Sequence, residues 1–286
     1  MGDNVSEPVW EEAHRLAMTR GERQYVDPDT GYRVFTEEAL RKRLACCGCG
    51  CRHCPWAHEA VPMDQRSQRA IRPSALHGVM PGGPNRVLFW SGGKDSFLAL
   101  RTLIRSGGSD DIVLLTTFGL PDRRIAHQEL AIQQVVDQAR ALQLPLFGVP
   151  LPPRSDYLSV MTDALNTLAS MASIRQLVFG DLHLRHIRDW REQQLAPLAK
   201  TLGANTHYPL WDVAYDALFA DLLVSGVIAT VCAAPEAESI VPCAVGDAFT
   251  AEWAARLPSS TDRFGECGEF HTYVEPVSLL PVSSWE

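Results

Sequence analysis

The chain has 286 residues, of which 46% are apolar, and its formal net charge at pH 7 is −8. This length suffices for one large domain or two ordinary ones. The negative charge disfavours non-specific binding to nucleic acid, so we do not expect a nucleic-acid partner. No apolar stretch is long enough to cross a bilayer, and the first residues lack the features of a secretion signal. We therefore expect a cytoplasmic protein without a membrane partner.

The first part of the chain predicts two short helices with a hairpin between them. Apolar spacing indicates an amphipathic helix at 10–18, and short strands at 24–26 and 32–35 flank an Asp-Pro-Asp-Thr-Gly turn. Thr36 fits an N-cap for a helix at 37–44, whose acidic start and basic end suit the helix dipole. That helix leads into the segment CCGCGCRHCPW.

Five of the eight cysteines fall between positions 46 and 54. In a chain without a secretion signal, such a cluster indicates metal binding before disulfides. With His53 the segment offers six soft ligands, whereas one zinc ion or one iron–sulfur cluster needs four. The alternative is a set of reduced thiols or adventitious disulfides.

The pattern CCxxxCxxCP, preceded by YRVFTEEALRKR, resembles the cysteine-rich module DUF5522, whose function is unknown. Four cysteines occupy positions shared with that family: Cys46, Cys47, Cys51 and Cys54. The resemblance implies that these four hold the metal, and Cys49, which departs from the family pattern, is an additional candidate. We expect His53 to lie outside the ligand set. Zn²⁺ and an iron–sulfur cluster both remain open.

Residues 57–84 are rich in proline and glycine and have no sustained apolar period, so they predict a surface linker. A buried strand at 87–90 follows, and apolar residues recur at helical spacing from Phe97 onward. The hexapeptide between them offers an anion converging backbone N–H groups and a positive helix N-terminus. Its residues are Ser91, Gly92, Gly93, Lys94, Asp95 and Ser96.

Each residue of this hexapeptide has a chemical reason to be there. The two glycines allow a close backbone approach to phosphates, and the serine hydroxyls are donors. Lys94 adds a charge, and Asp95 can reach Mg²⁺ or cap the helix. The plain alternative is a strand-to-helix turn that merely needs glycine. The hexapeptide resembles the SGGxDS signature of the PP-loop ATP pyrophosphatases, the adenine nucleotide alpha-hydrolase-like group, which implies cleavage of ATP to AMP and pyrophosphate with Mg²⁺.

Downstream, short apolar strands at 112–118, 146–149 and 177–180 alternate with amphipathic helices. The helices are expected at 125–142, 156–171 and 184–202. This alternation predicts an α/β fold with a parallel sheet, and the PP-loop resemblance implies a Rossmann-like domain. Ligands bind such sheets at the carboxyl ends of the strands. We therefore expect Thr117, Gly180 and Asp181 to join the hexapeptide in one nucleotide site, with Thr117 or Phe118 beside the adenine.

Three further stretches resemble the diphthine–ammonia ligase branch of the PP-loop proteins. They are GDLHLRHIRDWREQQL from Gly180, PLW at 209–211, and GECGEFHTYV at 265–274, where Cys267 departs from the pattern. The resemblance implies a smaller α/β substrate domain after the sheet domain. We expect a cysteine-rich module at 1–56, the linker, an ATP-binding domain at 85–204 and this substrate domain at 205–286.

Glu266, Glu269 and His271 form a compact group that can act in acid–base chemistry or bind an amine. The alternative is an exposed acidic turn. The main hypothesis is an ATP-dependent ligase that forms an amide from a small-molecule or protein-borne carboxylate and ammonia or another amine. A first alternative is a sulfur-transfer or tRNA-modifying PP-loop enzyme with a cysteine-ligated iron–sulfur cluster. A second is a non-catalytic nucleotide-binding or scaffold protein.

Overall fold

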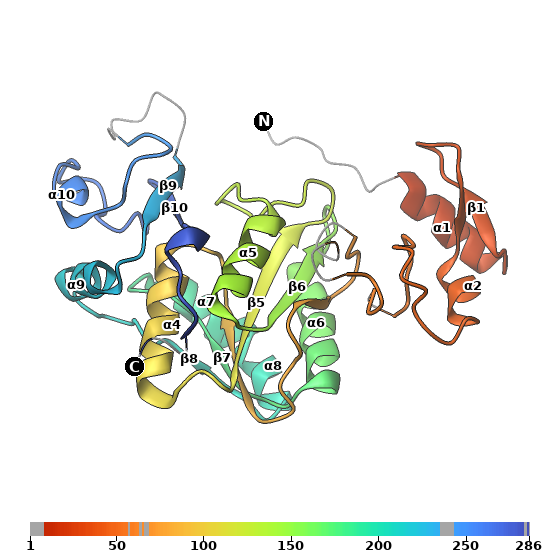
Figure 1. Ribbon diagram of the computed structural model, residues 1–286, viewed down its shortest axis with the longest axis horizontal. Coiled ribbons are helices and arrows are strands. Elements are labelled where there is room, and N and C mark those ends of the chain that lie inside the picture. Colours follow the sequence, from red (N-terminus) through yellow and green to blue (C-terminus); the bar gives the residue numbers. More distant parts are fainter. Residues whose placement is uncertain are drawn as a thin grey trace.

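The computed structural model describes residues 9–56, 58–62, 65, 69–234, 243–282 and 285. Within them, a six-stranded sheet has the strand order β3-β6-β5-β4-β7-β8 (Figure 1). The strands are β3 (Ser74–His77), β4 (Asn85–Phe89), β5 (Ile112–Gly119), β6 (Leu146–Leu151), β7 (Ile174–Val178) and β8 (Asn205–His207). Neighbouring strands are parallel, except that β3 pairs antiparallel with β6. The predicted α/β fold with a mostly parallel, Rossmann-like sheet is confirmed.

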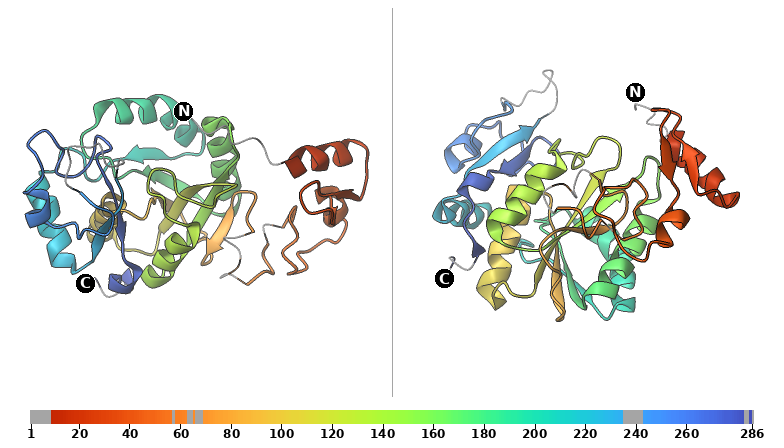
Figure 2. Two further views of the ribbon diagram at one scale, coloured as in Figure 1. Left: turned by 90° about the horizontal axis from the view of Figure 1, so that it is seen from above. Right: turned by 45° about the vertical axis from the view of Figure 1, so that its right-hand side comes forward.

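Helices cover both faces of this sheet (Figure 2). One face carries α4 (Lys94–Gly107) and α5 (Ile132–Leu142), and the other carries α6 (Tyr157–Met171) and α8 (Ala196–Thr201). Successive residues of β4 serve the two faces in turn: Leu88 packs in the first core and Val87 in the second. Two-sided burial explains why these strands are continuous apolar runs. Burying each such side chain contributes about 1.5–3 kcal/mol.

The strand order places a topological switch point beside β4. From β4 the chain moves outward through β5 and β6, and it then returns to β7 on the other side of β4. The carboxyl ends of β4 and β7 are therefore neighbours, and the loops that follow them diverge to opposite faces. Ligands of doubly wound sheets bind in the crevice that this divergence opens.

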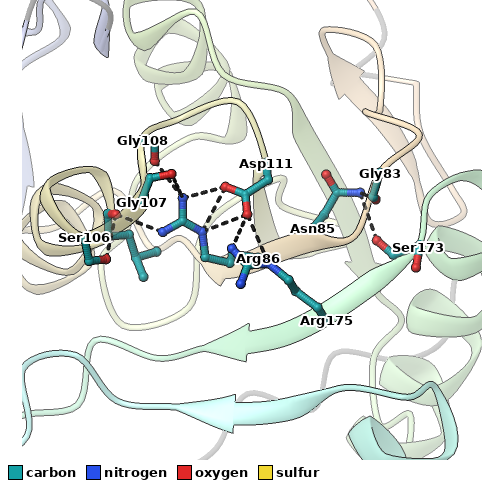
Figure 3. A network of polar contacts seen from close by, with 10 residues as sticks. Gly83, Asn85, Arg86, Ser106, Gly107, Gly108, Asp111, Ser173 and Arg175 are labelled. Atoms are coloured by element: carbon teal, nitrogen blue, oxygen red, sulfur yellow. Dashed lines mark hydrogen bonds and ion pairs between the residues drawn. The ribbon is translucent and has the colours of Figure 1, made fainter.

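A polar network connects the amino-terminal ends of the strands, on the side of the sheet opposite the switch-point crevice (Figure 3). Arg86, at the start of β4, donates through Nε to Asp111 at 2.9 Å and through Nη1 to the carbonyl of Leu103 at 2.8 Å. Arg175 of β7 also binds Asp111. Asn85 donates to the carbonyl of Ser173 at 2.9 Å. Arg86 and Arg175 share the carboxylate of Asp111, and Arg86 also binds backbone carbonyls, so the network ties the start of the sheet to the end of α4.

The C-terminal region is a smaller α/β unit beside the sheet, confirmed as predicted. It contains α9 (Tyr215–Ser225), β9 (Ala229–Ala233), α10 (Ala251–Ala254), β10 (His271–Val274) and the short 3₁₀ helix η1 (Pro276–Ser278). β9 and β10 pair antiparallel, and β10 packs against α4. The core of this unit is aromatic and includes Phe219, Phe249, Phe264 and Phe270.

The N-terminal module lies at one side of the sheet domain (Figure 1). It contains α1 (Val9–Thr19), β1 (Gln24–Val26), β2 (Arg33–Phe35) and α2 (Glu37–Arg41), and Thr36 caps α2 as predicted. The buried carboxylate of Asp27 pairs with Arg52 at 2.7 Å. Burial alone would raise the pKa of Asp27, but hydrogen bonds from Arg52 and Thr30 hold that pKa at about 2.

Short polar strands correct the predicted linker and domain limits. Residues 74–77 of the predicted linker form β3, and its Leu76 is fully buried; parts of the remaining linker, including Ala57, lie outside the described residues. β8, at 205–207, pairs with β7, so it belongs to the sheet rather than to the segment predicted after residue 204. Both strands were missed because they are only three or four residues long and largely polar.

Helix limits and one strand also differ from the predictions. The helix predicted at 125–142 begins at Ile132, because His127 and Glu129 have positive φ. The helix predicted at 184–202 divides at Leu195 into α7 (Arg185–Gln194) and α8, whose first turn contains a proline. β7 ends at Val178, so Gly180 and Asp181 follow the strand. Among the described helices, none has the length and apolarity required to span a membrane.

Candidate functional site

A cavity of about 670 Å³ opens at the carboxyl ends of β4, β5, β6 and β7. Phe89 and Phe179 form part of its wall, with ring centroids 4.5 Å apart. The loop between β5 and α5 contributes His127, and the C-terminal unit contributes Glu266 and His271. We call this space the strand-end cavity. Its volume lies in the range of small-molecule sites.

The predicted strand–loop–helix unit is present at one side of this cavity. β4 ends at Phe89, α4 begins at Lys94, and Ser91, Asp95 and Ser96 line the cavity. Gly92 has a φ of +85°, and a Cβ there would lie 2.8 Å from Oε1 of Gln138. Glycine is therefore required by both conformation and space.

Two distant segments hold the loop in place. Gln138 of α5 donates from Nε2 to the carbonyls of Gly92 at 2.9 Å and Val274 at 2.7 Å. The backbone N–H of Val274 in β10 donates to the same Gly92 carbonyl at 3.0 Å. Thr272 accepts from the backbone N–H of Lys94 at 3.1 Å. The last strand of the C-terminal unit therefore fixes the shape of the loop.

Lys94 is placed differently from the sequence expectation. Its side chain is only 3% exposed, and its Nζ pairs with Asp95 at 2.9 Å. Three phenyl rings of the C-terminal unit surround the ammonium, with centroid distances of 5.4 Å to Phe249, 5.3 Å to Phe264 and 5.7 Å to Phe270. These are cation–π distances. Lys94 is not among the residues that line the cavity, and neither are Gly92 and Gly93.

The serine hydroxyls are partly used within the loop itself. Ser96 donates to the carbonyl of Gly93 at 2.9 Å, which closes the first turn of α4. Ser91 donates weakly to Ser96 at 3.4 Å. Both hydroxyls nevertheless border the cavity. They can turn toward a ligand at the cost of these local bonds.

Carboxylates from three different parts of the chain meet at the cavity. Asp181 forms a bidentate pair with Arg191 of α7, at 2.7 and 3.1 Å. Asp95 pairs through Oδ2 with Lys94, while its buried Oδ1 has no hydrogen-bond partner among the described residues. Gly180 makes this meeting possible, because a Cβ there would lie 3.0 Å from the Asp95 carbonyl.

Glu266 is the third carboxyl group. Burial, reinforced by the negative charge of Asp95, raises the pKa of Glu266 to about 8. Burial and the charge of Lys94 lower the pKa of His271, which keeps its ring neutral. An acidic group poised near neutral pH beside a neutral imidazole can exchange protons with a bound ligand.

Some predicted site residues lie elsewhere. Glu269 is not among the lining residues: its carboxylate accepts from the backbone N–H groups of Asp262 at 2.9 Å and Cys267 at 3.0 Å, so it shapes the turn. Thr117 lines the cavity, but Phe118 is fully buried in the core and cannot border an adenine there.

A polar group beside the site was missed by the sequence analysis. The Tyr215 hydroxyl donates to Asp262 at 2.7 Å and lies 3.2 Å from Nδ1 of His183. The aromatic lining residues Tyr157 and Trp190 were also missed. No local signal identifies these residues, because they come from separate helices and loops that meet only in the folded chain.

The cysteine cluster forms two thiol pairs. Cys46 and Cys54 have their sulfur atoms 3.7 Å apart, and those of Cys47 and Cys51 are 3.6 Å apart. Two thiolates on one tetrahedral zinc would be separated by about 3.8 Å. Each pair therefore fits two ligands of one metal. The full set does not, because no group of three His, Cys, Asp or Glu side chains converges within the described residues.

One thiol in the cluster is prepared to ionise. The backbone N–H of Cys49 and the thiol of Cys51 lower the pKa of Cys47 to about 7. Burial raises the pKa of Cys51 to about 11. Cys49 is exposed and points its thiol toward the carbonyl of Cys47. His53 is buried and shares a hydrogen bond of 2.8 Å with the Tyr25 hydroxyl.

Fold and cavity together define a doubly wound α/β protein with a cavity at its switch point and a cysteine-rich N-terminal module. Residues 13–60 match DUF5522, described as a family of unknown function, which confirms the resemblance seen in the cysteine pattern. Among solved structures, the chain is similar to one described as a predicted subunit of tRNA methyltransferase from Methanocaldococcus jannaschii. The two share 20% identity with a TM-score of 0.37, over 67% of this chain and 96% of the other.

Proposed function

We propose that the strand-end cavity binds ATP and that the protein is an AMP-forming ligase similar to diphthine–ammonia ligase. A substrate carboxylate attacks the α-phosphorus, pyrophosphate leaves, and an acyl-adenylate forms. Ammonia or an amine then attacks the acyl carbon, and AMP leaves as the amide forms. The observation that carries this proposal is the meeting of the glycine loop, Gly180–Asp181 and Glu266–His271 around one cavity at the switch point.

The residues around the cavity suit a magnesium nucleotide. The indole of Trp190, which is exposed and lines the cavity, offers an aromatic surface to a planar base. The unpartnered Oδ1 of Asp95, together with Asp181, would hold Mg²⁺, which prefers carboxylate and phosphate oxygens. Bound Mg²⁺ would offset the charge that develops on the departing pyrophosphate. Without a cation, these carboxylates would repel the phosphates.

Glu266 is the proposed general base of the second step. Attack by an amine requires that the nitrogen lose a proton, and a carboxylate whose conjugate acid has a pKa near 8 accepts that proton efficiently at neutral pH. In the first step Glu266 has no proton to accept, because the attacking carboxylate is already ionised. The two half-reactions therefore depend on Glu266 to different degrees.

A second candidate function is nucleotide binding without catalysis. The position of Lys94 favours it: the ammonium lies among phenyl rings and pairs with Asp95 instead of bordering the cavity. The sulfur-transfer alternative receives less support, because no cysteine is among the residues described as lining this cavity. Zn²⁺ or an iron–sulfur cluster in the N-terminal module remains a proposal separate from the ligase chemistry.

ATP–pyrophosphate exchange across a panel of carboxylic acids tests the ligase. We expect exchange with at least one acid, loss of exchange in Asp181→Asn, and wild-type exchange in Asp163→Asn, a matched change at an exposed position of α6. Glu266→Gln should retain exchange and lose amide formation by about 100-fold. ATP binding without exchange or AMP release for any acid would favour the binding function instead. Equal loss of both half-reactions in Glu266→Gln would exclude the base role.

A further inference from the structure

A second cavity, of about 780 Å³, lies between the N-terminal module and the loop that joins β5 to α5. Trp10 of α1 and Phe35 of β2 line it from the module, and Leu120 lines it from the loop. We call it the module cavity. It is as large as a small-molecule site, and its walls combine apolar and charged side chains.

The charged side chains of the module cavity are all arginines. They are Arg33, Arg52, Arg69 and Arg123, and none of the described lining residues is acidic. Arg52 is neutralised by Asp27. The other three have no ion-pair partner within the ranges that the structure describes. Three neighbouring arginines without an ion-pair partner among the described residues are unexpected in a chain with a net charge of −8.

Two of these arginines are held in place by the fold. Nη1 of Arg69 donates to the carbonyl of Gly50 at 3.2 Å. Gly50 has a φ of +63°, and a Cβ there would lie 2.4 Å from that same Nη1. Glycine at position 50 therefore leaves the space that the guanidinium occupies. Substitution by any larger residue would displace Arg69.

Arg123 is positioned at an energetic cost. Its φ of +59° lies in the left-handed region, which costs a non-glycine residue about 1 kcal/mol or more. The guanidinium donates to the carbonyl of Ala70 and lies 5.6 Å from the ring centroid of Phe118. Burial lowers the pKa of Arg123, which reflects the cost of keeping its charge there. Strain and desolvation at one cation are typical of binding sites.

We propose that the module cavity binds a small molecule that carries a diphosphate group. A diphosphate ester carries up to about three negative charges at neutral pH, which matches the three guanidinium groups that have no ion-pair partner among the described residues. The planar guanidinium fork binds phosphate oxygens in bidentate fashion. The apolar part of the ligand would lie against Trp10, Phe35 and Leu120. This site is independent of the proposed ligase function.

Arginine-specific labelling with phenylglyoxal, resolved by peptide mass spectrometry, tests this site in the wild-type protein. Inorganic pyrophosphate is the probe. We expect it to slow the labelling of Arg33 and Arg69 about tenfold, since hydrogen bonds to charged groups contribute at least this factor, and to leave exposed Arg20 unchanged. Because the readout is specific to each residue, binding of pyrophosphate in the strand-end cavity does not interfere. Unchanged labelling of Arg33 and Arg69 would overturn the proposal.

Three further arms sharpen the test. Equal protection by citrate would overturn the preference for phosphate, and protection only by single-stranded RNA would overturn the small-molecule assignment. Stronger protection by ADP than by geranyl diphosphate would indicate a ligand with a ring system. Stronger protection by geranyl diphosphate would indicate an aliphatic ligand. Either outcome supports a diphosphate site. By calorimetry, Arg33→Glu should weaken pyrophosphate binding at this site about tenfold, while Arg20→Glu, with the same charge change, should not.

Discussion

The two cavities have similar volumes, but different charged side chains line them. The strand-end cavity is lined by Asp95, Asp181 and Glu266, whereas the module cavity is lined by arginines. In the first cavity Asp95 and Asp181 are paired with Lys94 and Arg191, and a bound cation would assist a polyphosphate there, whereas the arginines of the second can bind one directly. The loop between β5 and α5 contributes to both: Leu120 and Arg123 face one cavity, and His127 faces the other. The net charge of −8 therefore does not indicate which charged groups line a given cavity of this protein.

The largest expected effect on one cavity alone comes from removing the metal proposed for the N-terminal module. Replacing Cys46, Cys47, Cys51 and Cys54 by serine removes both thiol pairs, so we expect any bound metal to be lost and residues 20–60 to loosen. Cys51 lines the module cavity, so pyrophosphate protection there should disappear while ATP binding persists. Elemental analysis and the labelling assay measure both. Wild-type metal content in the variant would show that the ligand assignment is wrong.

Asp27→Asn should alter the module cavity with a smaller effect. It leaves Arg52 without its partner, so we expect the free energy of unfolding of the module to fall by about 3 kcal/mol. The freed charge should also tighten pyrophosphate binding. Asp29→Asn, an exposed change in the same turn, is the control. Chemical denaturation and calorimetry give the two values, and an unchanged denaturation midpoint would contradict the structural role of this pair.

The ion pair of Asp27 and Arg52 also predicts that the stability of the module depends on pH. The pKa of Asp27 is held at about 2 in the folded state, below its value of 3.8 as a free side chain. Its contribution to stability is therefore present above pH 3.8 and is lost as the pH falls toward 2. The wild-type module should lose more stability than Asp27→Asn over that interval. Parallel stability curves for the two proteins would argue against it.

Gly92→Ala tests the strand-end cavity. A side chain at this position meets Gln138 and requires a strained φ, so we expect a loss of about 2 kcal/mol in stability and a comparable weakening of ATP binding. Gly82→Ala, at a position with no atom within 4 Å of the added Cβ, should have neither effect. Pyrophosphate protection in the module cavity should be unchanged in both. If Gly92→Ala binds ATP with wild-type affinity, the glycine loop does not contribute to ATP binding.

The smallest expected effect concerns Glu266. Because its folded pKa of about 8 exceeds the value of a free carboxyl, the rate of amide formation at a constant concentration of unprotonated amine should rise about tenfold between pH 7 and 9 as Glu266 ionises. The same shift means that the contribution of Glu266 to stability declines as the pH rises from 4.5 to 8. Glu266→Gln should flatten the rate profile. A wild-type rate that is independent of pH would contradict the proposed base.

The sequence predicts contiguous features of this protein well. Strand, glycine loop and helix around 87–97 were correctly assigned, because their signals lie side by side in the chain. The aromatic surroundings of Lys94 could not be predicted, since its phenyl partners come from positions 249, 264 and 270. The helix predicted from Ile125 begins only at Ile132, because Ile125 and Leu130 are buried in a loop whose φ angles turn positive at His127 and Glu129. There, tertiary packing overrides local propensity.

The hydrogen bond from Val274 to Gly92 links the end of the chain to the start of its sheet domain. A ribosome synthesises Gly92 long before Val274, and an emerging chain folds its earlier parts first. The nascent sheet therefore carries an unbraced glycine loop until Val274 has left the exit tunnel. If the strand-end cavity binds a nucleotide as proposed, chains that stop before Val274 should bind it more weakly than chains that contain this residue.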